Sequence, residues 1–226
     1  MTNWNQDAEI LTLLHNGQKA EIKKLNIQEG WNFTEEEIDR MLKNDTTREG
    51  LVAIEDFFEI LNCVITSHLT GVDVSLVKDR ARDEFKIFLL VSLFNSLIKL
   101  DNLKLWPSKV GEALHTFFNR HFTREDKKKV ENNIDIQISA DSEPRPITFC
   151  EFADILYKIR CNFTHEGEYI CQFFKHSADA PAYQYRNVKK LNDVEKIITN
   201  FTFTEFKRMS SNAIKNWLIS GYNIKK

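Results

Sequence analysis

The chain has 226 residues, of which 42% are hydrophobic and 28% are charged. This length and composition suit one large globular domain with a substantial core. The formal net charge of −2 gives no overall attraction to nucleic acid or to an acidic membrane surface. Any binding of phosphate groups must therefore come from a local cluster of basic residues.

Turn-forming residues are scarce, with seven glycines and four prolines against seventeen phenylalanines. Together with long apolar-periodic stretches, this scarcity predicts a mostly helical protein. The polar and acidic first ten residues do not resemble a signal peptide. The most apolar run, residues 87–98, is too short to span a bilayer. We therefore expect a cytoplasmic protein that contacts no membrane.

Residues 1–45 are expected to form an N-terminal helical extension, with a first helix at 7–26, ahead of a main domain at 46–226. Thr34 with Glu37 matches the capping-box pattern, which predicts a helix starting at residue 35.

The main domain is expected to begin with another capping box, formed by Thr46 with Glu49. Long helices are predicted at about 50–69 and 76–100, and together with the segment 149–165 they should form the central bundle.

Residues 106–122 predict a helix starting near Pro107, because proline suits the first helical turn. Residues 123–135 are expected to add a helical turn or two before a polar loop at 139–146.

A third capping box, Thr148 with Glu151, opens a helix at 149–165. After Gly167, residues 168–174 and 182–188 predict a small β-hairpin. The chain should close with helices at 191–201 and 204–222. The expected fold class is all-α, a helical bundle with a small β-hairpin after the helix at 149–165.

The helix at 149–165 carries the residues of greatest chemical interest. On an ideal helix five of its apolar residues share one stripe that we expect to be buried: Phe149, Phe152, Leu156, Ile159 and Phe163. Arg160 lies at the edge of this stripe, whereas Asn162 and His165 lie close together on the far side.

The segment LYKIRCNFTHEG resembles the signature of HEPN-superfamily domains, helical proteins defined by an Arg-x4-6-His motif, here Arg160 to His165. The preceding segment, residues 83–100, is similar to the apolar helix with an internal asparagine that precedes the motif helix in many such domains. The resemblance covers about residues 50–220. This chain departs from the commonest form because Cys161 directly follows the arginine and Glu166 separates His165 from glycine.

This resemblance implies a metal-independent endoribonuclease that needs no cofactor and leaves 2′,3′-cyclic phosphate and 5′-hydroxyl ends. His165 would act as base on the ribose 2′-hydroxyl or as acid on the leaving 5′-oxygen. Arg160 would bind the phosphate oxygens. Asn162 would orient the imidazole or bind the substrate.

The resemblance also implies a homodimer in which two motif helices face each other. An ideal helix separates Arg160 and His165 by about 140°, so one copy does not obviously bring them together. Prokaryotic defence, stress response or a toxin–antitoxin pair is the implied setting, with an antitoxin or sensor protein as a further partner.

The densest basic cluster of the chain spans the end of the helix at 106–122 and the residues after it. It consists of Arg120, Arg124, Lys127, Lys128 and Lys129, against two acidic residues. Such a cluster can contact an RNA backbone or can simply be solvated.

Two alternatives to the ribonuclease remain open. One is a catalytically silent HEPN-like scaffold that binds a protein partner or a nucleotide. The other is a zinc-stabilised helical adaptor built on Cys150, Cys161 and Cys171 with His165 and His176, although the spacings lack the usual CxxC pattern.

Overall fold

The structure is a computed structural model. It describes the backbone of residues 4–66, 75–101, 110–138, 141–165, 173–175, 182–185 and 196–223. Side chains are described at residues 16–61, 85–101, 111–138, 141–161, 173–175 and 196–221.

The described part of the chain is mostly helical, as predicted, and also contains four short strands. In chain order the elements are α1 (Trp4–Gln28), α2 (Glu35–Lys43), α3 (Asp45–Thr66), α4 (Ser75–Asp101), α5 (Val110–His121), α6 (Arg124–Glu131), β1 (Ile134–Gln137), β2 (Arg145–Pro146), α7 (Phe149–His165), β3 (Ala182–Tyr185), β4 (Lys196–Thr199) and α8 (Phe203–Asn223).

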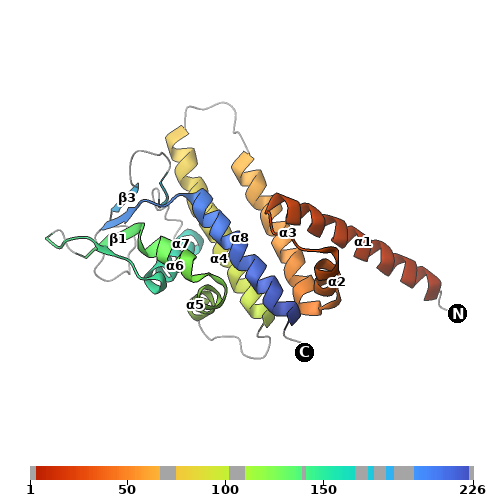
Figure 1. The fold of residues 1–226 in the computed structure, drawn as a ribbon. Coiled ribbons are helices and arrows are strands. Elements are labelled where there is room, and N and C mark those ends of the chain that lie inside the picture. Colours follow the sequence, from red (N-terminus) through yellow and green to blue (C-terminus); the bar gives the residue numbers. More distant parts are fainter. Residues whose placement is uncertain are drawn as a thin grey trace.

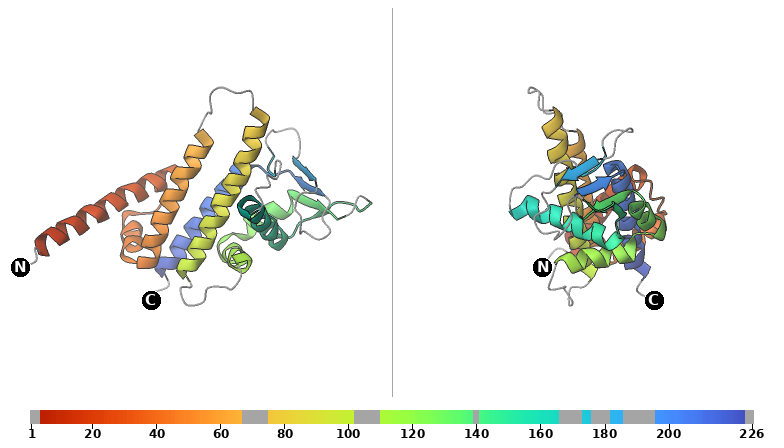
Figure 2. Two further views of the ribbon diagram at one scale, coloured as in Figure 1. Left: turned by 180° about the vertical axis from the view of Figure 1, so that it is seen from behind. Right: turned by 90° about the vertical axis from the view of Figure 1, so that its left-hand side faces the viewer.

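The long helices α3, α4 and α8 form the centre of the molecule (Figure 1). Helix α4 contacts α3, α5, α7 and α8, so it is the most central element. Helices α1 and α2 pack on one side of this centre, and α5, α6, α7 and the sheet lie on the other (Figures 1 and 2). The N-terminal half of α1 extends away from the body of the protein (Figure 2).

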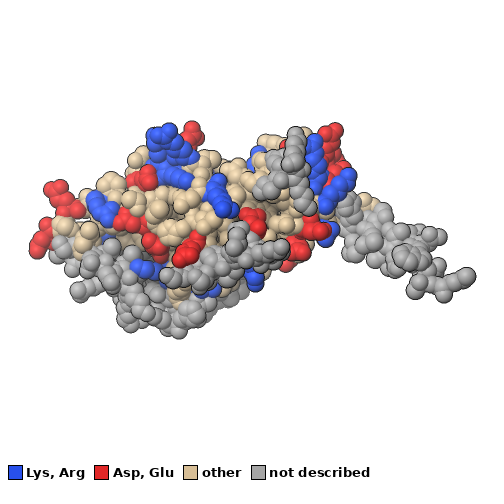
Figure 3. Space-filling model, turned by 90° about the horizontal axis from the view of Figure 1, so that it is seen from below, with Lys and Arg blue, Asp and Glu red and all other residues tan. Residues whose placement is uncertain are grey.

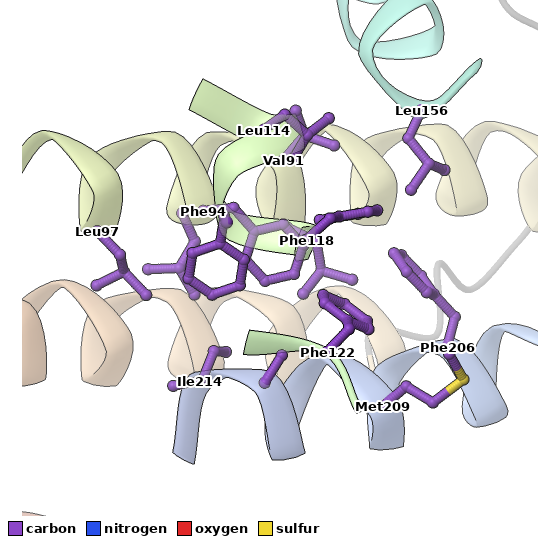
Figure 4. Close-up of a cluster of buried hydrophobic side chains, with 14 of the residues drawn as sticks. Val91, Phe94, Leu97, Leu114, Phe118, Phe122, Leu156, Phe206, Met209 and Ile214 are labelled. Atoms are coloured by element: carbon purple, nitrogen blue, oxygen red, sulfur yellow. The ribbon is translucent and has the colours of Figure 1, made fainter. Parts of the chain in front are cut away.

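Aromatic side chains fill the core between α4, α5, α7 and α8. The rings of Phe94 and Phe117 stack with centroids 4.5 Å apart, and those of Phe118 and Phe122 lie 4.6 Å apart. Phe206 of α8 meets the same region, as the close-up of the core shows (Figure 4). Large rings contribute most apolar area per residue, which explains how a chain rich in phenylalanine holds its short helices in place.

The core continues across the boundary expected at residue 45. Buried side chains of α1, α2 and the loop between them belong to the same apolar cluster as those of α3, α4 and α8. Trp31, 1% exposed, donates its indole N–H to the Ser211 hydroxyl of α8 at 2.8 Å. Thr34 and Glu37 form the predicted capping box at the start of α2.

Helix α3 starts differently from the prediction. It begins at Asp45, and the Asn44 side chain accepts a hydrogen bond from the Thr47 backbone N–H at 3.2 Å. The predicted cap, Thr46, therefore lies inside the first turn. Asparagine suits this position because its short side-chain carbonyl reaches the third N–H of a helix.

The four strands form one antiparallel sheet in the order β2-β1-β4-β3. The predicted helix at residues 191–201 is wrong where the structure describes it, because Lys196–Thr199 is strand β4. Side chains alternate between partly buried and buried along this strand, and β-branched residues are favoured on such a half-buried strand. Strand β1 was also missed, although α6 confirms the helical turns predicted before it.

The predicted strand at residues 182–188 is confirmed in part by β3 (Ala182–Tyr185), but the partner that the structure describes for it is β4. β3 pairs with β4, and within the described residues 173–175 only Lys175 forms a bridge, to Thr202. Most of the predicted first strand, residues 168–174, lies outside the described residues, as do Pro107 and the start expected there for α5.

Candidate functional site on helix α7

The start of α7 is fixed by the third predicted capping box. The Thr148 hydroxyl accepts from the Glu151 backbone N–H at 3.2 Å, and the Glu151 carboxylate accepts from the Thr148 backbone N–H at 2.8 Å. The same carboxylate takes two hydrogen bonds from the Arg145 guanidinium of β2, at 3.1 and 2.5 Å. This bonding to Arg145 lowers the pKa of Glu151 to about 2.

The predicted buried face of α7 is confirmed wherever its side chains are described. Four of the five predicted residues are at most 5% exposed: Phe149, Phe152, Leu156 and Ile159. This face packs on α4, α5 and α6, and the Phe152 ring meets Phe206 of α8 edge-on at 5.6 Å. The helix is therefore held firmly along one side, and the described side chains on its other side are only partly buried.

The Arg160–His165 motif occupies the last two turns of this helix. The backbone is α-helical through His165, and the Arg160 side chain is half-buried. The side chains of Asn162 and His165 lie outside the described residues. Regular helical geometry keeps residues 160 and 165 about 140° apart around the axis and about 7.5 Å apart along it.

Tyr157 and Cys161 lie on the same part of α7, one turn apart. Hydrogen bonding to Cys161 is the main cause that raises the pKa of Tyr157, burial adds to it, and the nearby Arg160 charge opposes it. The Tyr157 ring also faces α5, since a Cβ at Gly111 would lie 3.7 Å from it. Cys161, one of the two departures from the HEPN-like signature, therefore shares a hydrogen bond with Tyr157, which packs on α5.

A histidine and a carboxylate meet between α5 and α7. His115 Nε2 lies 2.8 Å from Asp154 Oδ1, and their side chains are 29% and 50% exposed. Lys158, one turn further along α7, has a lowered pKa because burial disfavours its charge, which Asp154 partly offsets. The sequence gives no sign of the His115–Asp154 contact, because 39 residues separate the two and each lies in its own helix.

The helical register places four residues of α7 on one stripe opposite the buried face. Asp154, Lys158, Cys161 and residue 165 fall within about 60° of one another around the helix axis. Asp154 is 50% exposed, and Lys158 and Cys161 are each half-buried. We call this set the α7 stripe. It presents acidic, basic and thiol groups along one line of a helix whose opposite face is buried.

The predicted basic cluster is only partly directed to solvent. Lys127 donates to the Asn119 carbonyl at 3.1 Å and lies over the Phe149 ring. Lys129 pairs with Glu205 at 2.7 Å. The remaining three members are exposed: Arg120, Arg124 and Lys128. On the face shown in Figure 3, basic groups alternate with acidic ones rather than forming one continuous field.

Neither a metal cluster nor a membrane span occurs in the part of the chain that the structure describes. No three His, Cys, Asp or Glu side chains there are grouped closely enough to hold a metal ion. Of the residues considered for zinc, Cys171, His176 and the side chain of His165 fall outside this part. The described helices also include none with the length and apolar character needed to cross a bilayer.

Comparison of the chain with family models, with curated proteins and with solved structures finds no significant match. Function is therefore inferred from the residues of α7 and their surroundings.

Proposed function

We propose that the protein is a metal-independent endoribonuclease of HEPN type, with its site on the last two turns of α7. The observation that carries the proposal is the asymmetry of α7: one face is buried in the bundle, and Asp154, Lys158 and Cys161 of the opposite face are only partly buried. A rigid helix suits a reactive constellation because packing on its other side holds the backbone of the reacting groups still.

The proposed reaction is an internal transesterification of RNA. The ribose 2′-oxygen attacks phosphorus, a base takes the 2′-hydroxyl proton, and the bond from phosphorus to the 5′-oxygen breaks as an acid protonates that oxygen. The products are a 2′,3′-cyclic phosphate and a 5′-hydroxyl, with no change of oxidation state. His165 is the proposed acid or base, because imidazole exchanges protons readily near neutral pH.

Arg160 is the proposed phosphate ligand. Its planar guanidinium can donate two hydrogen bonds to non-bridging oxygens, where charge accumulates as the 2′-oxygen adds. Asn162 would orient the imidazole or bind the substrate. The exposed basic residues Arg124 and Lys128 are candidates for contacts with the RNA backbone beyond the site.

The proposal includes a homodimer. Because α7 stays regular through His165, its backbone does not turn residues 160 and 165 toward each other. A second copy facing the same surface would supply to each site the motif residue, Arg160 or His165, that the first copy does not bring there. By the same resemblance we propose action on cytoplasmic RNA in a prokaryotic defence, stress-response or toxin–antitoxin setting, with an antitoxin or sensor protein as regulator.

The test is cleavage of a mixed-sequence single-stranded RNA by purified protein in EDTA. Wild type is compared with His165→Ala, Arg160→Ala and a control, Arg208→Ala, which removes an exposed arginine of α8. Cleavage leaving cyclic-phosphate ends, retained in the control and lost in both motif variants, is expected.

Two other results would contradict the proposal. No cleavage by a folded, dimeric wild type would favour the catalytically silent scaffold that binds a protein or nucleotide. Cleavage that survives both motif substitutions would place the site elsewhere.

A further inference from the structure

The His115–Asp154 pair has the arrangement of an oriented acid–base group. A carboxylate oxygen 2.8 Å from one ring nitrogen fixes the orientation of the imidazole and leaves the other nitrogen, Nδ1, for proton transfer. The pair is accessible, since the His115 side chain is 29% exposed and that of Asp154 is 50% exposed. It also lies at one end of the α7 stripe, of which Asp154 is the first member.

The distance along α7 prevents this pair from acting with His165 of the same copy. Residues 154 and 165 are eleven positions apart, which corresponds to about 16 Å along a helix. The base and the acid of the proposed reaction must both reach oxygens on one phosphorus atom, and hydrogen-bond reach is only about 3 Å. Within one copy the two histidines would serve different phosphates.

The spacing of the α7 stripe allows a different solution. Its members are separated by four, three and four residues, and this order is the same read in either direction. Two copies of α7 packed antiparallel about a two-fold axis would therefore align residue 154 of one copy with residue 165 of the other. At the centre of the pair, Lys158 would face Cys161 of the second copy. A two-fold contact has this self-complementary form.

We infer that His115, positioned by Asp154, is the second acid–base group of a composite site whose other histidine, His165, comes from the second copy. This inference rests on the proposed function. In each site one imidazole takes the 2′-hydroxyl proton and the other delivers a proton to the departing 5′-oxygen. Proton exchange with water then returns both imidazoles to their starting states, so the cycle balances.

Single substitutions test whether His115 takes part. His115→Ala and His115→Gln should each lower the cleavage rate by about 10²-fold or more, the usual contribution of an acid or base. In both variants one limb of the pH dependence of the cleavage rate should also disappear. The loss of a purely structural contact would not remove that limb. Asp154→Asn, a change of the positioning residue, should give a smaller loss and a shifted limb. Thr116→Ala, the neighbour on α5, is the matched control.

A mixed dimer tests where the two histidines come from. One copy carries His115→Ala, the other carries His165→Ala, and two different tags allow the heterodimer to be isolated after co-expression. If each site uses one histidine from each copy, one site contains both substitutions and the other contains neither. The heterodimer should therefore regain about half of the wild-type activity, although both mutant homodimers are inactive. This recovery also proves that the mutant chains fold.

The outcomes separate this inference from the proposed function. Full activity of the His115 variants, alongside an inactive His165→Ala, would overturn the inference and leave the ribonuclease standing. An isolated heterodimer without activity would overturn the composite site. A wild-type protein that cleaves no RNA would overturn the proposed function itself, and this inference with it.

Discussion

Gly50 of α3 lies directly against the indole ring of Trp217 of α8. A Cβ added at Gly50 would be 2.3 Å from Trp217 Cη2 and 2.5 Å from Cζ3. The ring is 1% exposed and has no room to move away without disturbing the core. Glycine therefore sets how closely two of the three central helices approach, despite its low helix propensity.

We expect Gly50→Ala to destabilise the protein by about 1–3 kcal/mol, the usual cost of overpacking a tight core. Gly17→Ala in α1 is the matched control, because a Cβ there would have no atom within 4 Å. That control should stabilise by about 0.5–1 kcal/mol through better helix propensity. Thermal unfolding of both variants gives opposite shifts in Tm. A neutral or stabilising Gly50→Ala would contradict the close packing.

His121 should make stability depend on pH. Its ring is 5% exposed, lies tilted against the Phe117 ring with centroids 4.9 Å apart, and has no hydrogen-bond partner for either nitrogen among the described residues. Burial, with a smaller effect of the Arg120 charge, lowers the pKa of His121 from 6.5 to about 4.

Because the unfolded chain binds this proton more readily, stability is lost as pH falls from about 6.5 toward 4. The full effect corresponds to about 3 kcal/mol. His121→Leu should remove this contribution and leave a flatter curve of unfolding free energy against pH in that window. Urea unfolding at pH 4.5, 5.5 and 7 measures it. An unchanged slope in the variant would contradict a buried neutral imidazole.

The hydrogen bond between Trp31 and Ser211 ties the N-terminal segment to α8. Both residues are buried, at 1% and 3% exposed. Trp31→Phe should cost more than the lost bond, because it leaves the Ser211 hydroxyl buried without this donor and removes part of a large apolar ring.

A double-mutant cycle with Ser211→Ala should give a coupling of about 1 kcal/mol between the two residues. Denaturant unfolding should also show one cooperative transition that includes residues 16–44, because their buried side chains belong to the common core. Additive single substitutions, or a separate early transition of the N-terminal helices, would contradict this connection.

The Arg145–Glu151 pair should stabilise the folded protein at neutral pH and not in acid. The pKa of Glu151 is lowered from 4.5 to about 2, chiefly by Arg145, so the contribution is present above pH 4.5 and is lost as pH falls toward 2. Both side chains are partly exposed, 44% and 31%, so the effect should stay below about 1 kcal/mol.

Arg145→Gln therefore should be less stable than wild type at pH 6 and equal to it near pH 2. Glu143→Gln, which changes an exposed acid two residues before Arg145, serves as the control and should change neither value. A difference that persists at pH 2 would point to lost packing rather than to charge.

Much of α7 could be predicted from the sequence, because its signals are local. The cap formed by Thr148 and Glu151 spans four residues, and the buried stripe repeats with the helical period. The start of α3 was wrong because Asn44 and Thr46 are both good caps, and only the fold selects between them.

Strand β4 shows the limit of such reasoning. Residues 191–201 carry a pattern compatible with a helix, yet Ile197 and Thr199 are buried because residues 196–199 pair with β1, about 60 positions earlier in the chain. Short apolar runs are ambiguous between helix and strand until their partners are known. Without these distant partners, the predicted class omitted the four-stranded sheet.

Local sequence signals specify which residues form the helix of the motif and which side of that helix is buried, because caps and periodicity act within a few turns. What lies beside this helix depends on the tertiary packing. His115 reaches Asp154, Trp31 reaches Ser211 and Gly50 meets Trp217 because helices distant in the chain pack together. Such contacts depend on the global arrangement of the core, which no local pattern encodes.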